Sequence, residues 1–331
     1  MQTLKHFVIK NESVLHYIKY SQSFPIKQIR KYIRNKNIKS MLPLKEVLDY
    51  YPKRIAIETT NYCNTNCSFC PHDKMKREMK VMDDELYKNL LLQIKDMNVE
   101  EIYLGFIGEP LLDKKLPERI SLAKSIRIKS VNIFTNAIFL TEEKVDKLID
   151  SKVDKIIISL DAFSDESYKK IRSFGSYQKV IQNINYLLEN KNGTRVDVGL
   201  LLLGKEYKAH IPEFLKKWKD ADNVLFRLPH NWAGRVNAVE EQKIKKSNLP
   251  CYSLWTQMNV LSNGKVVPCC MDMDAELTVG DATKNLLEEI WNSKMYQNLR
   301  RLHIQGKENK IDLCKKCDIS YSNTLPWWYY E

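Results

Sequence analysis

The segment that points most directly to an architecture reads Ile55-Ala56-Ile57-Glu58-Thr59-Thr60-Asn61-Tyr62-Cys63-Asn64-Thr65-Asn66-Cys67-Ser68-Phe69-Cys70-Pro71. Its first residues are apolar and β-branched, which predicts a short buried strand. Three cysteines follow in the spacing C-x3-C-x2-C, on an expected loop at the carboxyl end of that strand. Because parallel α/β folds place their active sites on such loops, the segment predicts a thiolate site there.

The residues that follow this segment repeat its strand-then-helix pattern. Helical periodicity is expected near 83–97, 116–127, 142–151, 165–190 and 208–219. Short β-branched runs, each an expected strand, lie at 54–59, 101–106, 130–135, 155–160, 195–203 and 224–228. Strands that alternate with helices predict βαβ units and a parallel sheet. Six units rather than eight favour an α/β fold with a partial (β/α)6 barrel.

Four regions are expected along the chain. Residues 1–52 are basic and helical, 53–230 form the barrel, and 231–250 form a polar bridge. Residues 251–331 form a small C-terminal domain with a hairpin at 258–267, a helix near 286–302 and its last cysteines in a polar loop. The turn signal Ser262-Asn263-Gly264 supports the hairpin.

Composition and charge narrow the class of protein. The 331 residues are 44% hydrophobic, enough for a large core, and carry a formal charge of +12. Residues 1–54 contain twelve Lys and Arg against three acidic residues, which predicts either a solvated helical face or a nearby anionic partner. No apolar run reaches the roughly 18 residues of a membrane span, and no signal peptide is evident, so we expect a cytoplasmic location.

All eight cysteines fall into groups, which in a reducing compartment indicates metal binding rather than disulfides. Three thiolates on a four-iron cluster leave one iron open for a small ligand. A structural zinc site would need a fourth ligand, for which His72 is the local candidate, so zinc stays an alternative.

The C-x3-C-x2-C spacing, with Phe69 before the third cysteine, resembles the radical S-adenosylmethionine superfamily. The resemblance implies that Cys63, Cys67 and Cys70 hold a [4Fe–4S] cluster. Its open iron would bind S-adenosylmethionine, and reductive cleavage would yield a 5′-deoxyadenosyl radical that takes a hydrogen atom from substrate. It also implies an electron donor such as flavodoxin or ferredoxin.

Further segments are similar to motifs of this superfamily. Gly105-Phe106-Ile107-Gly108-Glu109-Pro110 resembles a Gly-Gly-Glu-Pro element whose first paired glycine is Ile107 here. Thr135-Asn136-Ala137 resembles Thr-Asn-Gly with its glycine lost. The cofactor-binding residues that the resemblance implies are Phe69, Gly108, Glu109, Asn136, Ser159 and Arg172.

A second cysteine set, Cys251, Cys269, Cys314 and Cys317, resembles the short twitch form of the SPASM domain. That resemblance implies a second [4Fe–4S] cluster without an open iron. A zinc ion with four thiolates has the same ligand count and stays an alternative.

Cys270 is left over after seven cysteines are assigned. A thiol can return a hydrogen atom to a carbon radical, so we predict epimerisation of a sugar or aminocyclitol carbon with Cys270 as the donor. The alternative is oxidation to a ketone with the auxiliary cluster as electron acceptor. Candidate substrate-binding residues are Arg227, His230, Asn231, Trp232, Arg235 and Asp272.

Two other classes of protein share some of these features. A peptide-modifying SPASM maturase often carries a leader-recognition domain of winged-helix type, and residues 1–52 are too short for one. A nucleic-acid-binding zinc protein would fit the charge but not a three-cysteine loop on a barrel strand. We therefore expect a small-molecule substrate and not nucleic acid.

Overall fold

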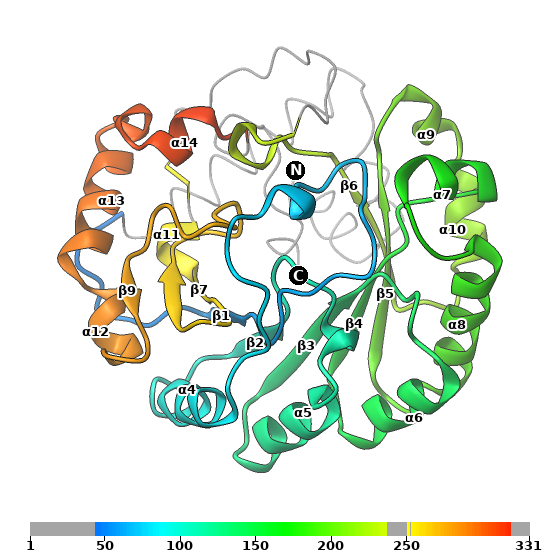
Figure 1. Cartoon of the computed structure of the whole chain (residues 1–331), viewed down its shortest axis with the longest axis horizontal. Coiled ribbons are helices and arrows are strands. Elements are labelled where there is room, and N and C mark those ends of the chain that lie inside the picture. The colour runs from blue at the N-terminus through cyan, green and yellow to red at the C-terminus, as the bar shows by residue number, and fades with distance from the viewer. Residues whose placement is uncertain (1–43, 237–249, 252, 319–331) are drawn as a thin grey trace, which may run out of the picture. The chain divides into compact units, whose positions relative to one another are not determined.

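The computed structural model describes residues 44–236, 250–251 and 253–318 (Figure 1). Apart from Leu44, these residues belong to one compact unit, Lys45–Ser322. The predicted basic helical segment 1–52 lies outside the described residues except for 44–52, which contain bends and no helix.

A single nine-stranded sheet organises this unit, in the order β6-β5-β4-β3-β2-β1-β7-β8-β9. Its first six strands are parallel and pair in sequence order, which confirms the predicted partial barrel. They are β1 (Arg54–Ile57), β2 (Glu101–Leu104), β3 (Ser130–Thr135), β4 (Lys155–Ser159), β5 (Arg195–Leu201) and β6 (Asn223–Arg227).

The two faces of the sheet differ in polarity because alternate residues point to opposite sides. Paired residues of neighbouring strands share a face, and one such row is entirely apolar: Ile57, Leu104, Ile133, Ile156 and Val196. The convex side of the sheet is surrounded by α4 (Asp84–Asp96), α5 (Leu116–Ser125), α6 (Glu142–Asp150), α8 (Tyr177–Asn190) and α10 (Ile211–Lys217) (Figure 1). The opposite face carries polar and charged residues such as Asn132 and Asp197, so the concave side is the polar one.

The described helices mostly match the predicted periodicity. They are α4 (Asp84–Asp96), α5 (Leu116–Ser125), α6 (Glu142–Asp150), α7 (Asp165–Ile171), α8 (Tyr177–Asn190), α9 (Lys205–Ala209), α10 (Ile211–Lys217), α11 (Ser253–Thr256), α12 (Leu287–Trp291), α13 (Lys294–Ile304) and α14 (Asp312–Lys316). Short 3-10 turns lie at His72–Lys74, Pro110–Leu112, Trp232–Gly234 and Glu308–Lys310.

Three predicted helices are each divided in two. The helix expected over 165–190 breaks after α7, where Arg172 is extended and Gly175 has a φ of +96°. Pro212 opens α10 after a turn at His210, which separates it from α9. Ser293 caps α13 by accepting a hydrogen bond from Tyr296 N–H, so α12 and α13 are separate.

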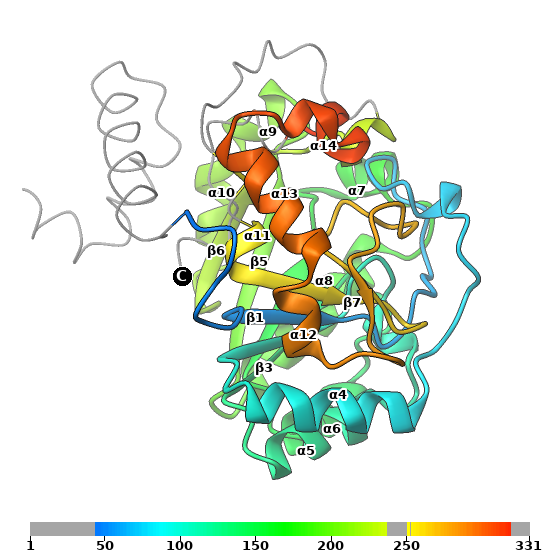
Figure 2. The same ribbon diagram turned by 90° about the vertical axis from the view of Figure 1, so that its left-hand side faces the viewer.

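The C-terminal part continues the barrel sheet. The predicted hairpin is present as β7 (Gln257–Val260) and β8 (Lys265–Val267), followed by β9 (Gly280–Asp281). β7 pairs parallel with β1, and α12 and α13 lie over this end of the sheet (Figure 2). The prediction of a polar loop for the last cysteines is wrong in part, since Cys314 lies within α14 and Cys317 ends it.

Among the described residues, no helix is long and apolar enough to cross a membrane.

Candidate functional site

The predicted three-cysteine loop leaves the carboxyl end of β1. Cys67 is buried, and Cys63 and Cys70 are half-buried. Burial is the largest cause that raises the pKa of Cys63 to about 11 and that of Cys70 to about 12. Each of these two thiols also lies within electrostatic reach of Cys67. The loop therefore gathers three thiols that need a bound cation to become thiolates at neutral pH.

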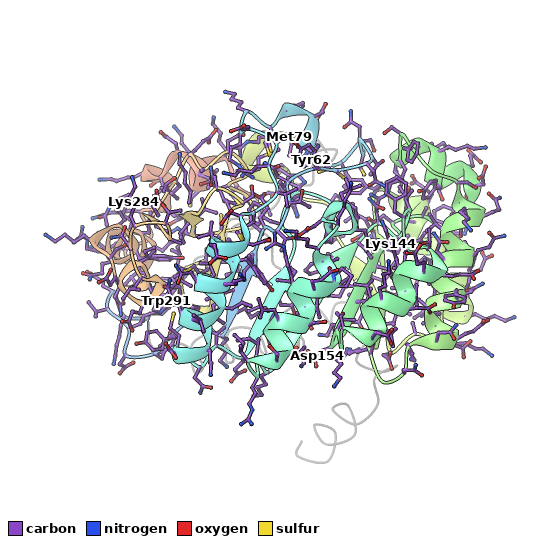
Figure 3. The ribbon with its side chains drawn as sticks, turned by 60° about the horizontal axis from the view of Figure 1, so that its bottom comes forward. Tyr62, Met79, Lys144, Asp154, Lys284 and Trp291 are labelled. Carbon is purple, nitrogen blue, oxygen red and sulfur yellow. The ribbon has the colours of Figure 1, made fainter. Side chains whose placement is uncertain are left out.

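Asn61, which is fully buried, connects the start of this loop to the segment by which the chain returns to the sheet. Its Nδ2 donates to Glu78 O at 2.8 Å, and its Oδ1 accepts from Lys80 N–H at 2.6 Å. The Tyr62 hydroxyl bonds Met79 O at 3.3 Å, and Figure 3 shows these two side chains next to each other. His72, the candidate fourth zinc ligand, places Nε2 2.8 Å from Asn61 O and so belongs to the same loop scaffold.

Gly108 and Glu109 lie directly against the cysteine loop. A Cβ on Gly108 would lie only 2.6 Å from Thr60 O, and Glu109 N–H donates to Tyr62 O at 2.8 Å. The buried Glu109 carboxylate accepts from Thr135 Oγ1 at 2.7 Å and from Asn136 N–H at 2.8 Å. Burial raises its pKa. Glu109 therefore ties the ends of β2 and β3 together beneath the loop.

The Thr-Asn-Ala element continues this network. Asn136 Nδ2 donates to Asn64 Oδ1 at 2.8 Å, which links the end of β3 to the residue after Cys63. Asn64 Nδ2 is buried and has no hydrogen-bond partner. Ala137, which stands where the resemblance expects glycine, has a φ of +59° and so keeps the left-handed backbone.

Arg172 connects the predicted cofactor residues to the cysteines. Its Nη1 donates to Cys67 Sγ at 2.8 Å, and its Nη2 donates to Ser159 O at 2.5 Å and to Asp161 at 3.0 Å. Its Cζ lies 5.6 Å from the centroid of the Phe69 ring. Asp161 is not among the site residues predicted from the sequence. Its carboxylate is buried, and this burial raises its pKa.

The remaining five cysteines come together in the C-terminal part. The pKa of Cys269 lies well above its ordinary value, first because of burial and then because Cys270, Cys314, Cys317 and Cys251 are near. Burial also raises the pKa of Cys270 to about 12. Cys270 therefore lies near the four predicted ligands, in agreement with its place directly after Cys269 in the sequence. His303, which the sequence analysis missed, accepts a hydrogen bond from Cys251 N–H at 3.2 Å.

Both cysteine groups have the donor chemistry of iron–sulfur sites. They offer buried or half-buried sulfur atoms, and the first also offers an arginine donor to sulfur, a contact that tunes such clusters. In the part of the chain that the structure describes, no three or more His, Cys, Asp or Glu side chains converge on the position of a single metal ion. A four-iron cluster binds each thiolate at a different iron, which spreads the sulfurs more widely than one zinc ion does.

Three of the predicted substrate-binding residues are engaged by the protein itself. Asn231 N–H donates to Asp318 at 2.8 Å, and Arg235 pairs with Glu276 at 2.9 Å. The buried Asp272 accepts from the backbone N–H groups of Glu276 and Leu277, each at 2.8 Å.

The other three candidates lie between the sheet and the cysteine loop. Arg227 ends β6 and places Cζ 6.0 Å from the centroid of the Phe134 ring. The His230 and Trp232 rings pack edge to face with 4.8 Å between their centroids. Trp232 Nε1 donates a hydrogen bond to Phe69 O at 2.9 Å. This segment therefore reaches from the concave face to the cysteine loop.

A buried ion pair that the sequence analysis also missed joins the cysteine loop to the C-terminal hairpin. Glu58, fully buried after β1, accepts from Arg77 at 2.7 and 2.8 Å and from Ser262 Oγ at 3.0 Å. Arg77 also donates to Met273 O. The available signal was a carboxylate directly after an apolar strand.

Comparison with known proteins agrees with this geometry. The profile of the Radical SAM superfamily matches residues 57–217, and that of SPASM, an iron–sulfur cluster-binding domain, matches 251–318. The S-adenosyl-L-methionine-dependent 2-deoxy-scyllo-inosamine dehydrogenase of Niallia circulans is 24% identical over 273 residues, 80% of this chain and 92% of that protein. A probable GTP 3′,8-cyclase of Methanocaldococcus jannaschii is 30% identical over 176 residues, 52% of this chain and 57% of its own. The chain thus spans little more than half of that cyclase.

Two solved structures share the fold. BtrN in complex with AdoMet and 2-DOIA superposes with a TM-score of 0.62 at 22% identity, covering 85% of this chain and 98% of BtrN. Streptococcus suis SuiB bound to precursor peptide SuiA superposes with a TM-score of 0.64 at 18% sequence identity, covering 85% of this chain and 73% of SuiB. A radical SAM domain uses a [4Fe–4S] cluster and S-adenosylmethionine, and an SPASM domain binds additional iron–sulfur clusters. With both profiles matched in order along one chain, this protein belongs to the radical SAM superfamily and carries a C-terminal SPASM domain.

Proposed function

We propose that this enzyme oxidises a secondary alcohol carbon of a sugar or aminocyclitol to a ketone. The observation that carries the proposal is the position of Cys270 beside the auxiliary thiols, since Cys270 packs with Cys269 and Cys317 against the same buried cluster. A cysteine within that group is less suited to donate a hydrogen atom to substrate. The dehydrogenase of Niallia circulans, which aligns over 92% of its own length, supports the same reaction.

We assign Cys63, Cys67 and Cys70 to the cluster that binds S-adenosylmethionine, and Cys251, Cys269, Cys314 and Cys317 to an auxiliary cluster. When bound, these groups supply a hydrogen-atom acceptor and a one-electron acceptor, which with loss of a proton to solvent balance the oxidation of an alcohol.

The chain's own residues orient and enclose these groups. Arg172 holds Cys67 Sγ and the end of β4 in one arrangement, and its charge favours the thiolate form of Cys67. Glu109 fixes the ends of β2 and β3 against the cysteine loop. Trp232, which follows β6, holds the cysteine loop through the hydrogen bond that its indole N–H donates to Phe69 O. Burial by these residues excludes water from the place where a radical would form.

The test uses the reconstituted protein in deuterium oxide with S-adenosylmethionine and a reductant, and with 2-deoxy-scyllo-inosamine and glucose 6-phosphate as separate probes. We expect 5′-deoxyadenosine and a ketone, trapped as a hydrazone, in equal amounts, with no solvent deuterium in the product. A product of unchanged formula that carries one solvent deuterium would instead establish epimerisation.

Epimerisation with Cys270 as hydrogen-atom donor is the second candidate. Cys270 and Trp232 both pack against the cluster of Ala233, Met271 and Leu313, and the Trp232 indole N–H donates to Phe69 O, so this cluster and Trp232 link the thiol to the cysteine loop. A peptide substrate has weaker support, since the likeness to SuiB is one of fold at 18% identity.

A further inference from the structure

We propose that the substrate carries an oxyanion group, a phosphate or a carboxylate, and that Arg227 binds it on the concave face of the sheet. This inference deepens the proposed function and rests on it. Three observations support this inference. They are the position of the Arg227 guanidinium over β5, the aromatic and charged groups around that guanidinium, and the unpartnered nitrogen of His230.

Gly199 is the first of these observations. It lies within β5, between Ser159 of β4 and Leu225 of β6. A Cβ on Gly199 would lie 3.2 Å from Arg227 Nη2 and 3.5 Å from its Cζ. Glycine weakens the interior of a strand and marks a place where another group approaches closely. Here the group that approaches is the guanidinium, so Arg227 folds back from β6 across the neighbouring strand.

The surroundings of the guanidinium suit a charged ligand. Phe134, which Arg227 faces at 6.0 Å, stacks on Tyr103 at 5.3 Å between ring centroids and forms an aromatic wall. Asp161 lies within electrostatic reach of both Arg227 and Arg172. A guanidinium presents its N–H donors as a planar fork, the geometry that binds two oxygens of a phosphate or carboxylate at once.

His230 supplies a neutral partner for the rest of such a ligand. Its Nδ1 is buried and has no hydrogen-bond partner. Burial, and next the charge of Arg227, lower the pKa of His230 to about 4, so the ring is uncharged at neutral pH. A neutral imidazole can exchange a hydrogen bond with a hydroxyl group. A phosphorylated or carboxylated sugar could therefore place its anion on Arg227 and a hydroxyl on His230, on the side of the cysteine loop.

The experiment measures binding of three probes to the reconstituted holoenzyme with S-adenosylmethionine present. The probes are glucose, glucose 6-phosphate and glucuronate, and the readout is isothermal titration calorimetry. We expect at least one of the two anionic probes to bind about tenfold more tightly than glucose, since charge-assisted bidentate hydrogen bonds are stronger than neutral ones. Whether phosphate or carboxylate is preferred identifies the source of the anion.

Four variants make the result specific. Arg227→Gln should abolish the preference for the anion, and Arg227→Lys should retain part of it, because it keeps the charge and loses the fork. Gly199→Ala changes no charge but should weaken the preference several-fold by displacing the guanidinium. Arg301→Gln removes an exposed charge from α13 and should leave the preference intact.

Equal binding of all three probes, or a preference that survives in Arg227→Gln, would overturn the proposal. If Arg301→Gln lost the preference for the anionic probes as fully as Arg227→Gln, the preference would be due to overall charge, and the proposal would again be overturned. The proposed function fails separately, if the holoenzyme forms 5′-deoxyadenosine without oxidising any alcohol while anion binding is intact.

Discussion

Gly108 shows how one residue without a side chain positions the cysteine loop. Three backbone atoms of the loop, from Thr60, Asn61 and Tyr62, lie within 2.8 Å of the point that a Cβ would occupy. We expect Gly108→Ala to displace the loop, to cost at least the ~1–3 kcal/mol typical of overpacking, and to lower the iron bound by the first site. Gly193→Ala is the control. A Cβ on Gly193 would meet no atom within 4 Å, but the φ of +87° at this position strains any other residue, so the control separates backbone strain from displacement of the loop. Normal iron content in Gly108→Ala would show that the loop does not depend on this contact.

Cys270 separates the two fates of the substrate radical. If oxidation is the reaction, Cys270→Ala should form ketone within about threefold of the wild-type rate, because its conservative change removes no assigned ligand. Cys314→Ala, which removes an assigned ligand, should lose the auxiliary cluster spectrum and the ketone together. Loss of product with 5′-deoxyadenosine still formed in Cys270→Ala would favour the hydrogen-atom donor instead.

His230 predicts a pH dependence of stability. Its pKa is about 4 in the folded protein and 6.5 in an unfolded chain, so the unfolded state binds more protons between these values. The contribution of His230 to stability is therefore complete above pH 6.5 and is lost as the pH falls towards 4. We expect the urea midpoint to drop between pH 7.5 and 5 by less in His230→Gln than in the wild type. An identical drop in both would mean that His230 is not neutral in the fold.

Elements far apart in sequence meet at the ion pair of Glu58 and Arg77. The side chains are 0% and 7% exposed, and they join the end of β1, the return limb of the cysteine loop and the β7–β8 turn. Removing one partner of a buried pair leaves an uncompensated charge, which costs about 3–5 kcal/mol. Arg77→Met should therefore lower stability by that amount, as measured by urea unfolding.

The double variant Arg77→Met with Glu58→Gln provides the matched control for this element. It removes both charges, so it should recover part of the loss of the single variant. A single variant as stable as the wild type would show that the pair does not hold these elements together.

For the whole molecule, the shared sheet is the main consequence of the fold. β1 lies between β2 and β7, so the SPASM region and the barrel are parts of one sheet. A chain that stops at residue 236 would expose the β7 edge of β1 and the apolar side chains packed there. We expect it to be insoluble or to bind no iron, as judged by gel filtration and iron analysis. A soluble monomer with a normal first cluster would contradict this view.

The predicted strands were recovered well because β-branched runs between helices are a local signal. Helix boundaries were predicted less well, since the break after α7 depends on an extended Arg172 whose side chain is required at Cys67 and Asp161. The same holds for Cys314, whose polar neighbours face outwards from a helix while Leu313 is buried. In each case a tertiary contact outweighed local propensity.

The sequence by itself determined the three-cysteine loop, because short spacing places three thiols on one turn of chain whatever surrounds them. It also determined the six parallel strands, because their hydrophobic pattern repeats along the chain. Only the tertiary structure decided that Arg172 meets Cys67 and that Arg227 lies over Gly199. These contacts join residues up to about a hundred positions apart or in separate elements, and only the closure of one sheet through β1 and β7 and the packing around it bring such groups together.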